Sequence, residues 1–297
     1  SNKVEKLSLI KNLMREQNKK YGSVVLSFGK DEKDWDKVSS GIKEIDEIIG
    51  GGFPYGRFSV IWGDEGVGKS TLAYNIVAQA QKSGKMVAYL DLENSFDKER
   101  ATFFGINLEN LVLGHFPIAE QSLDTIIKLV RNKAVDVIIL DSIHSLSPKG
   151  EQEEKSGKEK STEDDTMALL ARKLSQFFRM ASHYVYKANT AVIMIGQTRT
   201  KLGGFVALET LSGGHALKHN SVLTIYMRKG TKTDAPTKVE VIIDDEGKKH
   251  RHKKVIGFDC VIKIDKTQTP NTKPEGTKIH LPFYYNTGFY NENCVTI

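Results

Sequence analysis

The chain has 297 residues, of which 39% are hydrophobic and 27% are charged, and its formal net charge is +6 at pH 7. This composition is that of an ordinary globular protein with one large core or two modest ones. No stretch approaches the about 18 apolar residues of a membrane span, and no secretory signal opens the chain, so we expect a cytoplasmic protein without a membrane segment. The basic excess is compatible with a polyanionic partner but does not establish one.

The first 37 residues predict a helix followed by a strand. Apolar residues recur at helical spacing over residues 4–20, with Lys and Glu between them. Residues 23–28 (SVVLSF) form an apolar run between two glycines, which is typical of a β-strand. We therefore expect residues 1–37 to be an appendage of a core at residues 38–297. A simple extension packed on its own domain is the alternative.

From residue 38 strands and helices alternate, and near-continuous apolar strands in this arrangement indicate a mostly parallel sheet with helices on both faces. The expected strands are 58–62, 86–92, 135–140 and 190–195, and the expected helices are 71–81, 120–132 and 166–188. Beyond residue 220 the pattern changes to an antiparallel β extension. Its expected strands are 222–227, 239–243, 255–264 and 277–283. The two cysteines, Cys260 and Cys294, have no metal-site spacing and are expected to stay reduced.

Residues 63–70 read GDEGVGKS, which is the pattern G-x-x-x-x-G-K-[ST] between a predicted strand and a predicted helix. Its glycines allow positive φ, so successive backbone N–H groups can point into one concavity that binds phosphate at the positive end of the helix dipole. A glycine-rich turn that binds nothing is the alternative, but the complete pattern in this context predicts a nucleoside triphosphate site. Lys69 would reach the β- and γ-phosphates, and the Ser70 hydroxyl would coordinate Mg²⁺. The predicted nucleotide-binding residues are Gly63, Asp64, Glu65, Gly66, Val67, Gly68, Lys69, Ser70 and Thr71.

Polar residues follow three of the predicted strands. Asp141 ends an apolar run, where a carboxylate downstream of a P-loop holds a magnesium-bound water. Glu93 follows another buried strand, and a carboxylate at that tip can orient the attacking water. Gln197 ends a third strand, where a neutral amide can sense the γ-phosphate. The alternatives are a strand that happens to end in Asp, and an exposed helix cap at Glu93.

Three further segments are irregular or basic. Residues 149–165 contain no apolar residue and have mixed charge, and residues 199–214 contain four glycines, so both are expected to be long loops of functional or disordered type. Residues 248–254 (KKHRHKK) lie between two β-like runs and predict a basic hairpin tip that contacts a phosphate backbone. A solvated turn that protects a sheet edge is the alternative.

An ordered series of segments, rather than the P-loop alone, is similar to the bacterial RecA recombinase family and its phage relatives. The matching segments are 20–23, 42–54, 56–57, 84–85, 90–93, 135–142, 146–149, 196–199 and 213–218. The resemblance covers about residues 4–290 and implies a RecA-like P-loop NTPase core with a filament-forming N-terminal arm at residues 1–37. It also implies an ATP-dependent recombinase, a DNA-dependent ATPase that polymerises on single-stranded DNA and promotes homologous pairing and strand exchange with duplex DNA in recombination and repair.

The resemblance assigns roles to individual residues. Glu93 matches the catalytic glutamate, Asp141 the acidic residue behind Mg²⁺, Gln197 the switch between the γ-phosphate and the DNA loops, and Asp97 a position near the adenine. Residues 149–165 and 199–214 correspond to the two DNA-binding loops. The residues that match DNA-contacting positions, or stand in the second loop segment, are Arg172, Ser175, Arg179, Arg199, Phe205, Gly213 and Gly214. Arg228 and Lys229 resemble the start of a secondary DNA site, which residues 248–254 could extend. A DNA loop that joins a γ-phosphate sensor can be ordered by the nucleotide, so the two ligands would favour each other.

The match is incomplete where a neighbouring subunit would reach the nucleotide. Lys218 is retained, but His219 replaces an aromatic residue of the family. The paired lysines of the family are represented by Lys266 alone, because the partner position is Ile264 and Lys263 stands one place earlier. Three alternatives remain: a hexameric helicase-type motor, a non-catalytic recombination mediator or regulator, and a small-molecule kinase, for which no acceptor-binding lid is evident.

Overall fold

The structure is a computed structural model, and it describes residues 2–22, 24–32, 34–145, 163–201, 208–211, 214–243 and 249–289. The chain divides into two units, Ser1–Trp35 and Asp36–Ile297. Most of the predicted loop at 149–165 lies outside the described residues, and so do residues 202–207 and 212–213 of the predicted loop at 199–214. That second prediction is wrong for residues 199–201 and 208–211, which pair as antiparallel strands.

The first unit contains the helix α1 (Asn2–Tyr21) and the short 3₁₀ turn η1 (Gly29–Asp31), so the predicted helix is confirmed. The predicted strand at 23–28 is wrong, because residues 24–28 form no strand. The Asn18 side chain accepts hydrogen bonds from the backbone N–H groups of Val25 and Leu26, at 2.7 and 3.0 Å, and donates one to the Leu26 carbonyl. A side-chain amide thus satisfies backbone groups that a strand would give to a neighbouring strand.

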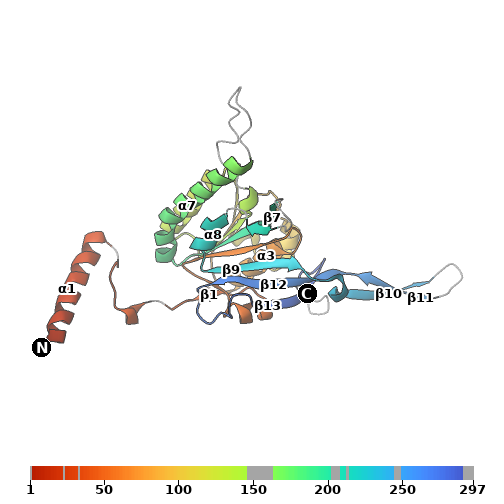
Figure 1. Ribbon diagram of the computed structural model, residues 1–297, viewed down its shortest axis with the longest axis horizontal. Coiled ribbons are helices and arrows are strands. Elements are labelled where there is room, and N and C mark those ends of the chain that lie inside the picture. Colours follow the sequence, from red (N-terminus) through yellow and green to blue (C-terminus); the bar gives the residue numbers. More distant parts are fainter. Residues whose placement is uncertain are drawn as a thin grey trace, which may run out of the picture. The chain divides into compact units, whose positions relative to one another are not determined.

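The second unit is built on one large sheet in the order β13-β12-β9-β3-β7-β6-β4-β5, with β8 paired to β7 (Figure 1). The strands are β3 (Phe58–Gly63), β4 (Val87–Asp91), β5 (Leu111–His115), β6 (Val137–Asp141), β7 (Ala191–Lys201), β8 (Leu208–Leu211), β9 (Leu223–Lys229), β12 (Gly257–Thr267) and β13 (Lys278–Tyr284). The six strands from β9 to β5 run parallel. The expectation of a purely antiparallel extension is therefore wrong for β9, which is parallel to β3 and antiparallel to β12.

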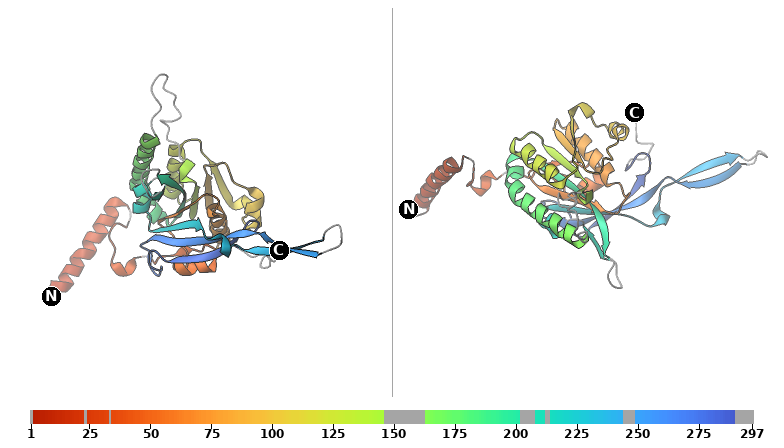
Figure 2. Two further views of the ribbon diagram at one scale, coloured as in Figure 1. Left: turned by 45° about the vertical axis from the view of Figure 1, so that its right-hand side comes forward. Right: turned by 90° about the horizontal axis from the view of Figure 1, so that it is seen from above.

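Helices cover both faces of this sheet (Figure 2). They are α2 (Lys43–Ile48), α3 (Lys69–Lys82), α4 (Lys98–Phe103), α5 (Ala119–Arg131), α7 (Glu163–Ala188) and α8 (Gly214–Asn220), with 3₁₀ turns η2 (Leu108–Asn110), η3 (Ile143–Ser145) and η4 (Lys232–Asp234). Alternate residues of each strand enter opposite cores. On β6, Val137 and Ile139 pack in the core of α2, α3 and α4, whereas Ile138 and Leu140 pack in that of α5, α7 and α8. The α/β class with two covered faces is confirmed.

Two small sheets stand apart from the large one: β1 (Lys37–Val38) pairs with β2 (Phe53–Pro54), and β10 (Thr237–Ile243) pairs with β11 (Lys249–Val255). The β10–β11 ribbon projects beyond the core (Figure 1). The predicted hairpin tip at 248–254 is wrong, because residues 249–254 are paired along their length with β10. A run that alternates basic and other polar residues can form a strand when its partner supplies the β-branched residues, as β10 does here. Residues 244–248 lie outside the described residues.

No helix among the described residues is long and apolar enough to cross a bilayer. Cys260 is a free, buried thiol, and burial raises its pKa to about 12. The other cysteine, Cys294, lies outside the described residues.

Candidate nucleotide and DNA sites

The loop between β3 and α3 requires glycine at two positions. Gly63 has φ 149°, and a Cβ there would lie 1.8 Å from the Met227 carbonyl oxygen of the neighbouring strand. Gly68 has φ 91°, and a Cβ there would lie 2.3 Å from the Phe283 ring. Gly68 also caps α3 without any side-chain hydrogen bond to the first turn. The N–H groups at the start of α3 are therefore available to an anion.

Lys69 is the first residue of α3 and is only 7% exposed. Its Nζ donates to the Gly63 carbonyl at 3.0 Å and to the Asp64 carbonyl, so the ammonium group lies in the curve of the loop. Burial lowers the pKa of Lys69, and the nearby carboxylates, Asp141 first, oppose that shift. A buried cation held by two carbonyls has charge left for a ligand, and a phosphate group is the natural partner.

The ends of β4 and β6 and an inner residue of β7 bring Glu93, Ser142 and Gln197 together beside this loop, so the prediction that Gln197 ends its strand is wrong. Glu93 Oε1 accepts a hydrogen bond from the Ser142 hydroxyl and another from Gln197 Nε2 at 3.2 Å. The sequence predicted Glu93 and Gln197 separately, but it did not predict that they touch. Ser142 was missed as a site residue, and its position directly after Asp141 was the available signal. One carboxylate oxygen thus joins residues of, or directly after, three neighbouring strands.

Asp141 lies at the end of β6 and is 3% exposed. Its Oδ2 accepts a hydrogen bond from the Tyr89 hydroxyl at 2.6 Å. Burial raises the pKa of Asp141, while hydrogen bonds from Tyr89 and Ser70 favour its charged form. The sequence did not predict the role of Tyr89, because a tyrosine in an apolar strand gives no sign that its hydroxyl bonds to a distant carboxylate.

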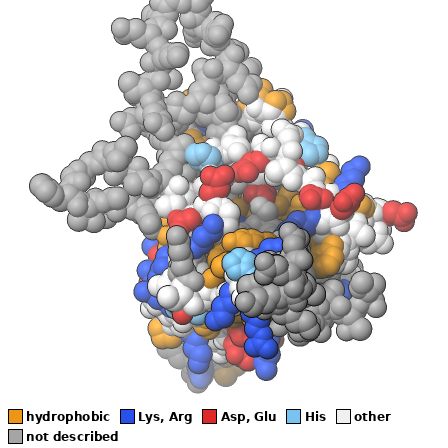
Figure 3. All heavy atoms as spheres, turned by 90° about the vertical axis from the view of Figure 1, so that its right-hand side faces the viewer, with side chains coloured by type: hydrophobic (Ala, Val, Ile, Leu, Met, Phe, Trp, Pro, Cys, Tyr) orange, Lys and Arg blue, Asp and Glu red, His pale blue; other side chains and the backbone are white. Residues whose placement is uncertain are grey.

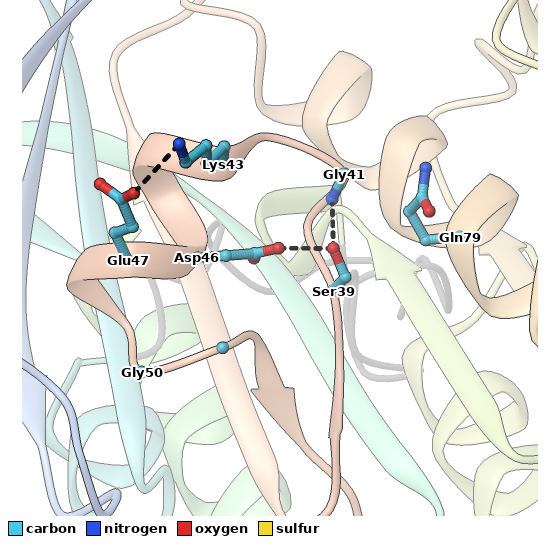
Figure 4. A pocket seen from close by; sticks show the side chains of 8 residues that line it. Ser39, Gly41, Lys43, Asp46, Glu47, Gly50 and Gln79 are labelled. Atoms are coloured by element: carbon cyan, nitrogen blue, oxygen red, sulfur yellow. Dashed lines mark hydrogen bonds and ion pairs between the residues drawn. The ribbon is translucent and has the colours of Figure 1, made fainter.

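These groups line a cleft of about 290 Å³. Its wall contains the P-loop, Glu93, Asp141, Gln197 and the Phe283 ring of the distant strand β13. A larger hollow of about 640 Å³ lies elsewhere on the core, around Asp46 and Gln79 (Figure 4). Its polar groups are bonded to one another, as in the Ser39–Asp46 hydrogen bond and the Lys43–Glu47 ion pair at 3.8 Å. That hollow contains no P-loop residue, so the smaller cleft is the candidate nucleotide site.

Asp97, which was predicted to lie near the adenine, and Thr71 of the P-loop region have hydrogen-bond partners within the chain. The Asp97 carboxylate caps α4 by accepting the Arg100 N–H at 3.0 Å. The Arg100 guanidinium donates to the Thr71 hydroxyl at 3.2 Å and lies 5.5 Å from the Phe104 ring centroid. Arg100 was not predicted, and it joins two residues that were predicted for the nucleotide.

Lys218 and Lys266, predicted to reach a nucleotide, are engaged within the chain. Lys218 forms an ion pair with Asp265 at 3.0 Å. Lys266 Nζ donates to the carbonyls of Lys218, His219 and Ser221, at 2.6, 3.1 and 2.7 Å. These carbonyls end helix α8, so Lys266 caps its C-terminus.

The predicted DNA residues of α7 lie on one side of the helix. Arg172 and Arg179 are exposed, and Ser175 is partly buried with its hydroxyl bonded to the Ala171 carbonyl at 2.8 Å. The opposite side packs Leu174 and Phe178 into the core. The long helix therefore presents two arginines two turns apart to solvent.

The remaining predicted DNA residues fall into two groups. Arg199 lies in β7 opposite Thr210 of β8, Gly214 begins α8, and Phe205 and Gly213 lie outside the described residues. Arg228 donates to the Lys229 carbonyl at 3.0 Å. The Lys229 ammonium lies 5.1 Å from the Phe258 ring centroid and 4.0 Å from where a Cβ on Gly66 would stand. Lys229 thus lies close to the P-loop, which the sequence did not predict.

The comparisons with known proteins agree with this geometry. The family described as RecA N-terminal domain matches residues 8–261. A protein named Protein RecA from Mesoplasma florum is 37% identical over 234 residues, which are 77% of this chain and 68% of the relative.

The chain belongs to the RecA family. Protein RecA of Clostridium botulinum is 37% identical over 296 residues, covering 98% of this chain and 76% of the relative. Protein RecA of Porphyromonas gingivalis is 39% identical over 196 residues, covering 65% of this chain and 56% of the relative. The aligned part therefore spans between about half and three quarters of these RecA proteins.

The residues at this RecA-family site fit Mg²⁺ together with a triphosphate. No cluster of three or more His, Cys, Asp or Glu forms a metal site in the part of the chain that the structure describes. Magnesium needs no such cluster, because it keeps several waters and binds through one or two protein oxygens plus substrate phosphates. Asp141 and Ser70, which both line the cleft, provide that minimal set.

Proposed function

We propose that the protein is an ATP-dependent recombinase that assembles on single-stranded DNA and promotes homologous pairing and strand exchange. One contact carries this proposal: the Gln197 amide and the Glu93 carboxylate are 3.2 Å apart at the nucleotide cleft. Gln197 lies in β7, which continues to Lys201 at the start of the predicted second DNA loop. A change at the γ-phosphate can therefore be passed to that loop through one strand. Membership of the RecA family supports the same activity.

Hydrolysis of ATP to ADP and phosphate would use the residues of the cleft. Lys69 and the P-loop N–H groups would hold the phosphates, and Ser70 with Asp141 would hold Mg²⁺, which neutralises phosphate charge when bound. Glu93 would accept the proton of the attacking water. Gln197, which shares Oε1 of Glu93 with Ser142, would leave that oxygen when it turns to the γ-phosphate. Asp97 and Thr71 would border the nucleoside.

The DNA-binding surface would combine α7, the ends of β7 and α8, and the basic ribbon. Arg172 and Arg179 are exposed on α7, while Arg199, Phe205, Gly213 and Gly214 belong to the segments at the second loop. On β11, Arg251 and Lys253 stand opposite Val241 and Val239 of β10. Lys and Arg side chains are exposed on the face from which the ribbon projects (Figure 3). Such a surface contacts DNA phosphates in a salt-dependent manner.

Assembly would complete the site. The first unit would act as the oligomerisation arm, because its helix α1 exposes apolar side chains such as Val4 (73%) and Leu9 (60%) that a second copy would cover. Lys218 and Lys266 would then face the nucleotide of a neighbouring copy only after leaving their present partners. We expect this filament to work in the cytoplasm.

A strand-exchange assay with homologous and heterologous duplexes, in the presence of Mg²⁺ and ATP, tests the proposal. We expect product from the homologous duplex only. ATP hydrolysis without homology-dependent product would instead indicate a helicase-type motor, and binding to DNA without hydrolysis would indicate a recombination mediator.

A further inference from the structure

A buried tyrosine lies beneath the proposed metal site. Tyr89 is in the middle of β4 and is 2% exposed, and its hydroxyl donates to Asp141 Oδ2 at 2.6 Å. Asp141 is at the end of the neighbouring parallel strand β6 and is 3% exposed. A short hydrogen bond between two buried groups is stronger than the same bond at a surface.

The Tyr89 ring has little freedom to move. Its centroid lies 5.7 Å from that of Tyr74 on α3 and 5.3 Å from that of Phe96 in the segment after β4. A phenylalanine would fill the same space among these rings without bringing a polar atom into the core. The packing of the core therefore explains the ring of Tyr89 but not its hydroxyl.

We propose that Tyr89 is a positioning residue for the metal site, which holds the Asp141 carboxylate in one orientation at the cleft that Ser70 also lines. With one oxygen fixed by the phenol, the carboxylate cannot rotate freely and meets Mg²⁺ already oriented. A ligand that is fixed in advance loses less conformational freedom on binding and binds more tightly. This role rests on the proposed function, because it assumes that Asp141 and Ser70 hold Mg²⁺.

The change Tyr89→Phe removes only the hydroxyl and tests the role by binding rather than by turnover. A fluorescent ATP analogue is titrated with the full chain at stepwise MgCl₂ concentrations and without DNA. We expect the Mg²⁺ concentration at half-maximal binding to rise by about three- to tenfold in Tyr89→Phe, while affinity for the nucleotide in EDTA stays unchanged. Thermal unfolding in EDTA, without nucleotide, reports whether the variant is folded.

Tyr74→Phe is the matched control, because it removes a hydroxyl from the adjacent ring of the same cluster. That hydroxyl accepts the Asp97 N–H at 3.0 Å and has no hydrogen bond to Asp141. We expect Tyr74→Phe to leave the Mg²⁺ midpoint unchanged, whatever its effect on affinity for the nucleoside.

Three results would overturn the inference: an unchanged Mg²⁺ midpoint in Tyr89→Phe, an equal shift in Tyr74→Phe, or a Tyr89→Phe chain that no longer folds in EDTA, which would make the hydroxyl a requirement of the fold. These results differ from failure of the proposed function. If Asp141 and Ser70 did not hold Mg²⁺, the unaltered protein itself would show no Mg²⁺-dependent nucleotide binding, and if only strand exchange failed, the Mg²⁺ midpoints would still differ as expected.

Discussion

The nucleotide cleft and the basic surfaces of α7 and the β10–β11 ribbon differ in how far their charged side chains are buried. At the nucleotide cleft, Lys69 and Asp141 are 7% and 3% exposed, and every partner that holds them can be named. On α7 and the ribbon, Arg172, Arg179 and Arg251 are exposed side chains on regular elements. Burying a charged side chain costs free energy unless it is paired or hydrogen-bonded, whereas exposed charged side chains are common on protein surfaces. The cleft is therefore the more specific of the two regions, because the basic surfaces indicate only the sign of a partner's charge.

The largest effect is expected at the cleft, from Lys69→Ala. This change removes the cation at the β- and γ-phosphates, and we expect ATP turnover to fall by at least about 10²-fold. Phosphate release with saturating single-stranded DNA measures it. Lys82→Ala, at the exposed last turn of the same helix, is the control. Turnover close to that of the unaltered chain in Lys69→Ala would refute the assignment of the site.

Glu93→Gln distinguishes a role of Glu93 in ATP hydrolysis from a role in nucleotide binding. The amide oxygen of glutamine can still accept the hydrogen bonds from Ser142 and Gln197, so we expect nucleotide binding and DNA assembly to persist. Hydrolysis should fall by about 10²- to 10⁴-fold, because the proposed general base is lost. Glu99→Gln on the exposed surface of α4 should hydrolyse ATP normally. If Glu93→Gln instead lost nucleotide binding, Glu93 would have a structural role.

Lys266→Met tests a charged side chain whose burial is intermediate between that of the cleft and that of the basic surfaces. It removes a cation that donates to three carbonyls at the end of α8, so we expect a loss of about 2 kcal/mol in the free energy of unfolding. Urea denaturation of the chain without nucleotide measures it. Lys263→Met, on the same strand, is the control. Equal stability of both variants would mean that Lys266 is free to serve a neighbouring subunit.

The smallest effect is expected on the ribbon, from the double change Arg251→Gln and Lys253→Gln. If both side chains contact phosphates, the slope of log K against log salt for single-stranded DNA should decrease in magnitude by about 1.4. Binding by fluorescence anisotropy between low and moderate salt measures this slope. Lys98→Gln with Lys128→Gln, two exposed lysines of α4 and α5, should leave it unchanged. Identical slopes in all three proteins would remove the ribbon from the DNA surface.

The sequence predicted features that local patterns determine, but not those that depend on contacts with distant segments. The P-loop, the parallel strands and the strand-end carboxylate Asp141 follow local patterns of glycine, apolar runs and polar ends, and the fold predicted from them is confirmed. The strand at 23–28 and the basic tip at 248–254 were wrong, because both depend on a partner that local sequence does not identify.

Contacts between distant residues were also beyond the sequence. Phe283 lies against Gly68, and Lys266 caps α8, because antiparallel strands return late in the chain to the same sheet. The contact of Tyr89 could not be predicted from its apolar run, since its hydroxyl donates to a carboxylate 52 residues away. Periodicity identifies elements, but it does not identify which side chains meet between them.

The central claim is that the nucleotide at the cleft controls affinity for DNA through Gln197. The direct measurement is the dissociation constant for a single-stranded oligonucleotide with a non-hydrolysable ATP analogue and with ADP, in the unaltered chain and in Gln197→Ala. We predict at least about tenfold tighter binding with the analogue in the unaltered chain, a coupling of about 1.4 kcal/mol, and little difference in Gln197→Ala. Equal affinity in both nucleotide states of the unaltered chain would contradict the account.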